Sequence, residues 1–217
     1  MKILKRIAAF VIAGAALLTA GCGDSQASHE QKKSSGKVLV VYFSNPQSDG
    51  TDVDTHASRN RESKDLMGNV EYAASLIRQK TNAEVFRIET KDPLPSQYKA
   101  TADQAKKEQN EKARPALKNH LENIDGYDII YLGYPNWWGD LPMPVYTFLD
   151  ETDLSGKTVY PFVCHGGSKA SSTVSTIKKL EPKAEVSDDV LTLHWNEISK
   201  ADKLVDEWID QRGVNMI

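Results

Sequence analysis

Short apolar runs that alternate with amphipathic segments are the feature that most limits how this chain can fold. The first run, Val38–Phe43, reads VLVVYF and contains only aliphatic, β-branched and aromatic residues. Strands of a parallel sheet are covered on both faces and are almost continuously apolar, whereas strands with one wet face alternate apolar and polar residues. The run therefore predicts a strand in the middle of a parallel sheet.

The rest of the chain continues this alternation of strands and helices. Further predicted strands cover residues 85–88, 127–134, 158–164 and 190–194. Apolar residues three and four apart predict amphipathic helices, which cover residues 69–80, 171–180 and 197–211. Asp140 is expected to cap a shorter helix with Pro142 in its first turn, and the polar segment 100–121 is predicted to be a solvated helix. We therefore expect an α/β fold: a doubly wound, five-stranded parallel sheet with helices on both faces.

The first 22 residues are predicted to be a targeting segment. Lys2, Lys5 and Arg6 precede an apolar stretch at residues 7–18, which is too short to cross a bilayer and is typical of a secretory signal. The string LTAGC, which ends at Cys22, resembles the lipobox of bacterial lipoproteins. That resemblance implies that Cys22 is lipidated and anchors an extracytoplasmic domain to a bacterial cell membrane. The alternative is an ordinary cleaved signal peptide with an incidental cysteine.

Residues 23–36 are polar and have no apolar period, so we expect a flexible tether there and a single domain at residues 37–217. This domain carries 22 basic and 28 acidic residues, and such a net negative charge argues against nucleic acid as a partner. Two cysteines in the whole chain exclude a disulfide framework and a cysteine-rich zinc module. The scattered histidines indicate no metal site.

The loops after the first, third and fourth strands are the candidate binding loops, because doubly wound sheets bind ligands beyond the carboxyl ends of their strands. The first loop begins at Ser44 and ends at Gly68-Asn69, with the polar insertion 45–67 between them. A phosphate is expected at the helix start that follows. The third-strand loop has two adjacent indoles beside Pro and Gly, which suit a surface loop better than the core.

Together these motifs resemble the flavodoxin-like family over nearly all of residues 37–217. The motifs are Tyr-Phe-Ser, Gly-Asn at a helix start, Tyr-Pro-Asn-Trp-Trp-Gly and His-Gly-Gly-Ser, in the family's order. The resemblance implies the strand order 2-1-3-4-5 with FMN where the order reverses, as in flavodoxin itself.

The resemblance also implies a set of FMN-binding residues. The FMN phosphate would be lined by Ser44, Gly68, Asn69 and Val70. The isoalloxazine would be flanked by Pro135, Asn136, Trp137, Trp138 and Gly139. Its pyrimidine side would be bordered by Cys164, His165, Gly166 and Gly167. The sequence departs from the family pattern at Val70 and Cys164, where Thr is more usual, and in the insertion within the phosphate loop.

The function implied is electron transfer by bound FMN, or FMN-dependent reduction of quinone-like acceptors, with His165 available to hydrogen-bond the reduced acceptor. The partner would be a redox protein or a small aromatic or quinone acceptor. A flavin-free surface lipoprotein that acts as a binding module is one alternative. A serine hydrolase is another, since Ser168 lies in a near match to the nucleophile elbow and is followed by Asp188 or Asp189 and by His194.

Overall fold

The computed structural model describes residues 36–46, 67–95 and 97–212, which belong to one compact unit. The signal peptide, Cys22, the tether up to residue 35 and most of the insertion 45–67 lie outside the described residues. Within the described ranges, no helix combines the length and the apolar character that crossing a membrane requires.

Strands and helices alternate along the described chain, as predicted. The strands are β1 (Val38–Phe43), β2 (Glu84–Ile88), β3 (Ile129–Pro135), β4 (Thr158–His165), β5 (Glu185–Val186) and β6 (Leu191–His194). The α-helices are α1 (Asn69–Thr81), α2 (Tyr98–Glu111), α3 (Met143–Glu151), α4 (Thr173–Leu180) and α5 (Ala201–Asp210). A 3-10 helix, η1 (Trp195–Lys200), leads directly into α5, so the predicted helix 197–211 begins with a tighter turn.

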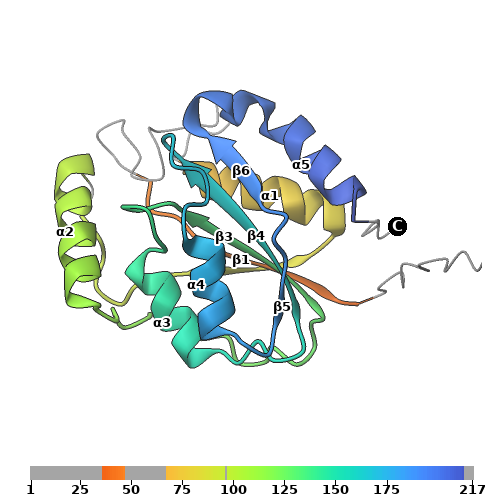
Figure 1. The fold of residues 1–217 in the computed structure, drawn as a ribbon, viewed down its shortest axis with the longest axis horizontal. Coiled ribbons are helices and arrows are strands. Elements are labelled where there is room, and N and C mark those ends of the chain that lie inside the picture. Colours follow the sequence, from red (N-terminus) through yellow and green to blue (C-terminus); the bar gives the residue numbers. More distant parts are fainter. Residues whose placement is uncertain (1–35, 47–66, 96, 213–217) are drawn as a thin grey trace, which may run out of the picture. The chain divides into compact units, whose positions relative to one another are not determined.

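The described strands form one parallel sheet in the order β2-β1-β3-β4-β5, which confirms the predicted order 2-1-3-4-5 (Figure 1). The outer position beside β4 is shared by two short strands. β5, which the sequence analysis missed, pairs with the start of β4, and β6 pairs with its end. This register places His194 directly opposite His165 at the carboxyl edge of the sheet.

Helices cover both faces of the sheet, as expected for a doubly wound fold (Figure 1). Val38, Val40 and Tyr42 of β1 face α1 and α5, whereas the residues between them face α3 and α4. Gly133 in β3 is required by this packing. A Cβ there would lie 2.0 Å from the ring of Phe162 on β4, so a larger residue would displace that ring from the core.

Two local predictions are wrong. The helix predicted at 100–121 ends at Glu111, because Lys112 adopts a left-handed conformation (φ 50°) that closes the helix. Asp140 does not cap α3, whose N-cap is Pro142. The Asp140 carboxylate instead accepts hydrogen bonds from the N–H of Leu141 (2.9 Å) and the hydroxyl of Tyr146 (2.7 Å).

Glu181, at the end of α4, is a buried acid with 7% of its surface exposed. Its Oε2 accepts a hydrogen bond from the N–H of Leu154 (3.2 Å). Burial raises the pKa of Glu181 from its ordinary value of 4.5 to about 7; the Leu154 N–H opposes this shift, and Asp153 and Asp150 add to it. The folded protein therefore holds this proton more tightly than the unfolded chain does. Its contribution to stability is fully present below pH 4.5 and is lost as the pH rises through about 7.

We expect Glu181→Gln to raise the free energy of unfolding at pH 8 by about 1–3 kcal/mol and to change it little at pH 4. The amide oxygen can still accept the Leu154 N–H but carries no charge to bury. Urea unfolding at the two pH values measures the difference, with Glu122→Gln at an exposed position as the control. Equal effects at both pH values would contradict the assignment.

Candidate functional site

Ser44 and the first turn of α1 lie around one guanidinium, that of Arg87 on β2. Arg87 donates to the backbone carbonyl of Ser44 (3.2 Å) and to Oε1 of Glu71 (3.2 Å). Gly68 precedes α1 in an extended conformation, and no side chain caps the helix. The N–H groups of a helix N-terminus carry partial positive charge, so this corner has the chemistry of an anion site.

Asn136 joins the loop after β3 to the loop after β4. Its Nδ2 donates to the carbonyl of Lys169 (2.7 Å) and to Oγ of Ser171 (2.9 Å). Its Oδ1 accepts the N–H of Gly139 (3.0 Å), and its own N–H donates to the carbonyl of Cys164 (2.9 Å). Both amide donors of Asn136 are therefore used within the protein, and the residue holds the two loops together.

The backbone of these two loops is strained at three positions. Trp138, Lys169 and Ser171 have φ values of 55°, 51° and 48°, in the left-handed region that favours glycine. Gly139 and Gly167 also have positive φ, at 82° and 137°. Such strain persists only where surrounding contacts enforce it, and it gathers at functional sites. Here the hydrogen bonds of Asn136 supply part of that enforcement.

The two adjacent indoles lie in different environments. Trp137 is 4% exposed and meets the ring of Phe43 edge to face, with 5.3 Å between ring centroids. The expectation that both indoles occupy the surface is therefore wrong for Trp137, which belongs to the core on the α3 and α4 face. Trp138 is 55% exposed, and its Nε1 donates to the carbonyl of Ala102 on α2 (3.2 Å).

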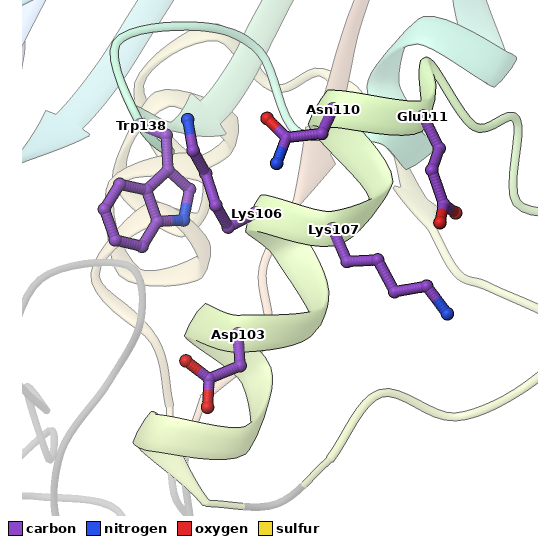
Figure 2. Close-up of a pocket in the computed structure, with 6 residues that line it drawn as sticks. All are labelled: Asp103, Lys106, Lys107, Asn110, Glu111 and Trp138. Atoms are coloured by element: carbon purple, nitrogen blue, oxygen red, sulfur yellow. The ribbon is translucent and has the colours of Figure 1, made fainter.

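A shallow pocket of about 390 Å³ lies between Trp138 and α2 (Figure 2). Its other lining residues are Asp103, Lys106, Lys107, Asn110 and Glu111. The Lys106 ammonium lies 5.3 Å from the indole centroid of Trp138, and Figure 2 shows its side chain between the indole and Asn110. An aromatic surface beside ammonium, amide and carboxylate groups suits a flat ligand with polar groups at its edge.

His165, at the end of β4, is 5% exposed, and its ring lies 5.3 Å from that of His194. Its Nδ1 faces the N–H of Gly167 at 3.0 Å and accepts from it. Burial lowers the pKa of His165, as do His194 and Lys169, while Glu197 opposes them. A neutral imidazole whose Nδ1 accepts carries its proton on Nε2.

The other predicted residues of this loop divide into buried and exposed positions. The side chain of Cys164 is buried on the α1 and α5 face, so it borders no surface site. Gly166 and Gly167 are exposed. No cluster of metal ligands occurs among the described residues.

A family profile described as flavodoxin matches residues 64–212 of this sequence, which is more than half of the chain. The chain belongs to the flavodoxin family. A protein from Bacteroides eggerthii classed as a flavoprotein is 27% identical, with a TM-score of 0.61 over 81% of this chain and 97% of the other. No curated protein matches the sequence significantly.

Two further solved structures show the same fold. One, from Bacteroides uniformis and likewise classed as a flavoprotein, is 24% identical, with a TM-score of 0.61 over 79% of this chain and 98% of the other. The other, a Lactobacillus acidophilus flavoprotein in complex with FMN, is 22% identical, with a TM-score of 0.54 over 80% and 99%.

The flavodoxin domain does not assemble the hydrolase triad considered from the sequence. Asp188 pairs with Lys178 (2.6 Å), and Asp189 pairs with the guanidinium of Arg212. Nδ1 of His194 contacts the side chain of Asn196. The two acids are therefore engaged elsewhere and do not orient His194, which argues against Ser168 as a nucleophile.

Glu71 and Arg87 lie at the corner beside Ser44 in the flavodoxin domain and were not predicted from the sequence as candidate site residues. The available signal was an arginine within the otherwise largely apolar strand EVFRI. Its partners lie 16 and 43 residues away along the chain, so no local pattern could reveal the pairing.

We expect the two indoles of this flavodoxin domain to differ in their contribution to stability. Trp137→Ala empties a buried site and should lower the free energy of unfolding by about 3–5 kcal/mol. Trp138→Ala removes an exposed ring and should lower it by less than about 1 kcal/mol. Urea unfolding of both variants is the measurement, and similar losses in the two would contradict the described orientation.

Proposed function

We propose that this flavodoxin domain binds one FMN at the carboxyl edge of its sheet and uses it to transfer electrons. The observation that carries the proposal is the joining of the loops after β3 and β4 by Asn136, beside strained residues at the ends of two central strands. The Lactobacillus acidophilus structure, which shares the fold, contains FMN. Such pre-organised loops at the strand ends are where doubly wound sheets bind ligands.

The residues present fit FMN. The start of α1 offers backbone N–H groups for a phosphate. A Cβ added at Gly139 or Gly167 would meet no atom within 4 Å, so both glycines border open space that a planar ring can approach. Trp138 is the exposed aromatic residue between α2 and the β3 loop. When bound, FMN supplies the redox chemistry.

In this proposal, different residues bind the phosphate and the ring of FMN. Ser44 and residues 68–70 would hold the phosphate, while residues 135–139 and the two glycines 166 and 167 would border the ring. Trp137 and Cys164 would contribute through the backbone, because both side chains are buried in the core. His165, the last residue of β4, accepts the Gly167 N–H on Nδ1, which leaves its Nε2–H as a hydrogen-bond donor.

A small aromatic acceptor of the quinone class fits the pocket beside Trp138 better than a protein partner does. The indole offers a stacking face, and Lys106, Lys107 and Asn110 offer donors to carbonyl oxygens. A protein-docking face would require a large patch, whereas this pocket of about 390 Å³ is of small-molecule size. The pocket therefore favours a reductase over a carrier.

We expect residues 37–217 to bind FMN one to one and, once reduced, to pass electrons to a soluble benzoquinone. Titration with quenching of flavin fluorescence measures binding, and anaerobic stopped-flow spectroscopy follows reoxidation. Trp138→Ala should raise the half-saturating quinone concentration about three- to tenfold, equivalent to roughly 0.7–1.4 kcal/mol of lost stacking. Trp195→Ala, at another exposed indole, is the matched control.

The outcomes separate the candidate functions. Absence of FMN binding would overturn the flavin proposal and leave the flavin-free binding module. FMN binding with rapid transfer to a redox protein, but none to quinone, would establish a carrier instead of a reductase.

We further propose that Cys22 is lipidated and holds the domain at the extracytoplasmic face of a bacterial membrane. The support is the sequence LTAGC after a basic and then apolar segment. Lipid chains on one cysteine would anchor the domain without a membrane-spanning helix. Residues 23–36 would then act as the spacer, with a reach of roughly 45–50 Å when fully extended.

We expect Cys22→Ala to abolish labelling by a radioactive fatty acid and to move the protein out of the washed membrane fraction or leave it as a larger precursor. Cys164→Ala is the matched control, because it changes the other cysteine of the chain. Unchanged labelling and mature size in the Cys22 variant would count against the anchor.

A further inference from the structure

The first turn of α1 contains a carboxylate where the proposed function requires a phosphate to bind. Glu71 is the third residue of the helix, and its side chain is 22% exposed. A carboxylate near a helix N-terminus is stabilised by the partial positive charge there. The same negative charge repels a phosphate dianion at that helix end. Unless it is compensated, Glu71 therefore disfavours a phosphorylated ligand.

Arg87 is placed to supply this compensation. It lies on the edge strand β2, opposite Tyr42 of β1, and its NH1 is 3.2 Å from Oε1 of Glu71. Its NH2 donates to the carbonyl of Ser44, the residue that follows β1. The guanidinium thus contacts both sides of the corner in which the phosphate is expected.

Tyr42 completes the surroundings of the Glu71 carboxylate without adding a charge. Its hydroxyl donates to Oε1 of Glu71 at 3.5 Å, and the Arg87 guanidinium lies 5.9 Å from its ring centroid. Burial, together with Glu71 and against the opposing effect of Arg87, raises the pKa of Tyr42 to about 12, so the phenol stays neutral. Arg87 is therefore the cation that balances Glu71 among these groups.

We infer that Arg87 sets the preference of the site for a phosphorylated flavin over the unphosphorylated one, because it cancels the charge of Glu71 at the start of α1. This inference rests on the proposed FMN site. Loss of Arg87 would leave an unpaired carboxylate beside the phosphate, and FMN affinity would fall. Riboflavin has no phosphate, so its affinity would not depend on this charge.

A purely structural role for Arg87 makes a different prediction. If the guanidinium acted only by holding the Ser44 carbonyl in place, its loss would disturb the loop for every flavin. Removal of the Glu71 charge would then not restore FMN affinity in the Arg87 variant. Measuring two ligands and a double variant separates charge compensation from loop tethering.

The experiment compares dissociation constants for FMN and riboflavin in wild type, Arg87→Gln, Glu71→Gln and the double variant of residues 37–217. We expect Arg87→Gln to weaken FMN binding at least tenfold and to leave riboflavin within twofold. Glu71→Gln alone should not weaken FMN binding, and the double variant should return to within threefold of wild type. Arg87→Lys should keep most of the FMN preference, because it keeps the charge.

Arg114→Gln is the matched control, since Arg114 also pairs with a carboxylate, Asp150, near the end of α3 that lies away from the carboxyl edge. Circular dichroism and thermal unfolding show whether each variant is folded. Equal loss of FMN and riboflavin in Arg87→Gln, or no recovery in the double variant, would overturn the inference. A wild-type protein that binds neither flavin would overturn the proposed function itself and this inference with it.

Discussion

The burial of β1 and β3 on both faces is the constraint from which the rest of the structure follows. Every residue of these two strands is buried, so helices must cover both sides of the sheet. Successive parallel strands need a crossover, and each connection from β1 to β5 contains a helix, whereas β6 follows β5 directly along the same edge of β4. Because the interior of the sheet is apolar, the polar groups that could bind a ligand lie at the strand ends. The packing is close enough that Gly133 admits no Cβ beside Phe162.

Polar side chains at the carboxyl edge act mainly to hold backbone in place. Asn136 spends both amide donors on the neighbouring loop, and His165 uses Nδ1 to accept the Gly167 N–H. The Arg87 guanidinium likewise holds the Ser44 carbonyl. These bonds offset backbone strain of order 1–3 kcal/mol at each left-handed residue. A ligand at this edge meets a preformed backbone surface, which lowers the ordering cost of binding.

The sequence was most informative where one local pattern decides the structure. The bounds of β1 were predicted to the residue, because an uninterrupted apolar run admits few other outcomes. β5 was missed because it is two residues long and too short to show a period. The end of α2 depends on the left-handed conformation of Lys112, which a lysine rarely adopts. For these two elements, tertiary context rather than local pattern set the result.

In the candidate site too, some features follow from local sequence pattern and others depend on tertiary context. The loops were located from motifs and strand order, but the environments of their side chains were not. Trp137 and Trp138 are identical in type and adjacent in sequence. Trp138 has a left-handed backbone, and its ring is exposed, whereas the ring of Trp137 is buried. The link between Glu71 and Arg87 joins residues from a helix and an edge strand, which the sequence presents as unrelated. Both features require the folded backbone.

The conformation of Trp138 is not explained by a contribution to the stability of the fold. Its indole is 55% exposed, so burial returns little of the hydrophobic free energy that a tryptophan can contribute. Its backbone is strained, and its ring donates one hydrogen bond to the Ala102 carbonyl and lies beside the Lys106 ammonium, both on α2. That helix buries two of its own residues, Thr101 and Ala105. Strained, exposed residues of this kind gather at functional sites. The pocket beside it supplies a functional reason if a flat ligand stacks there, and then α2 serves the site by fixing the indole rather than by completing the core.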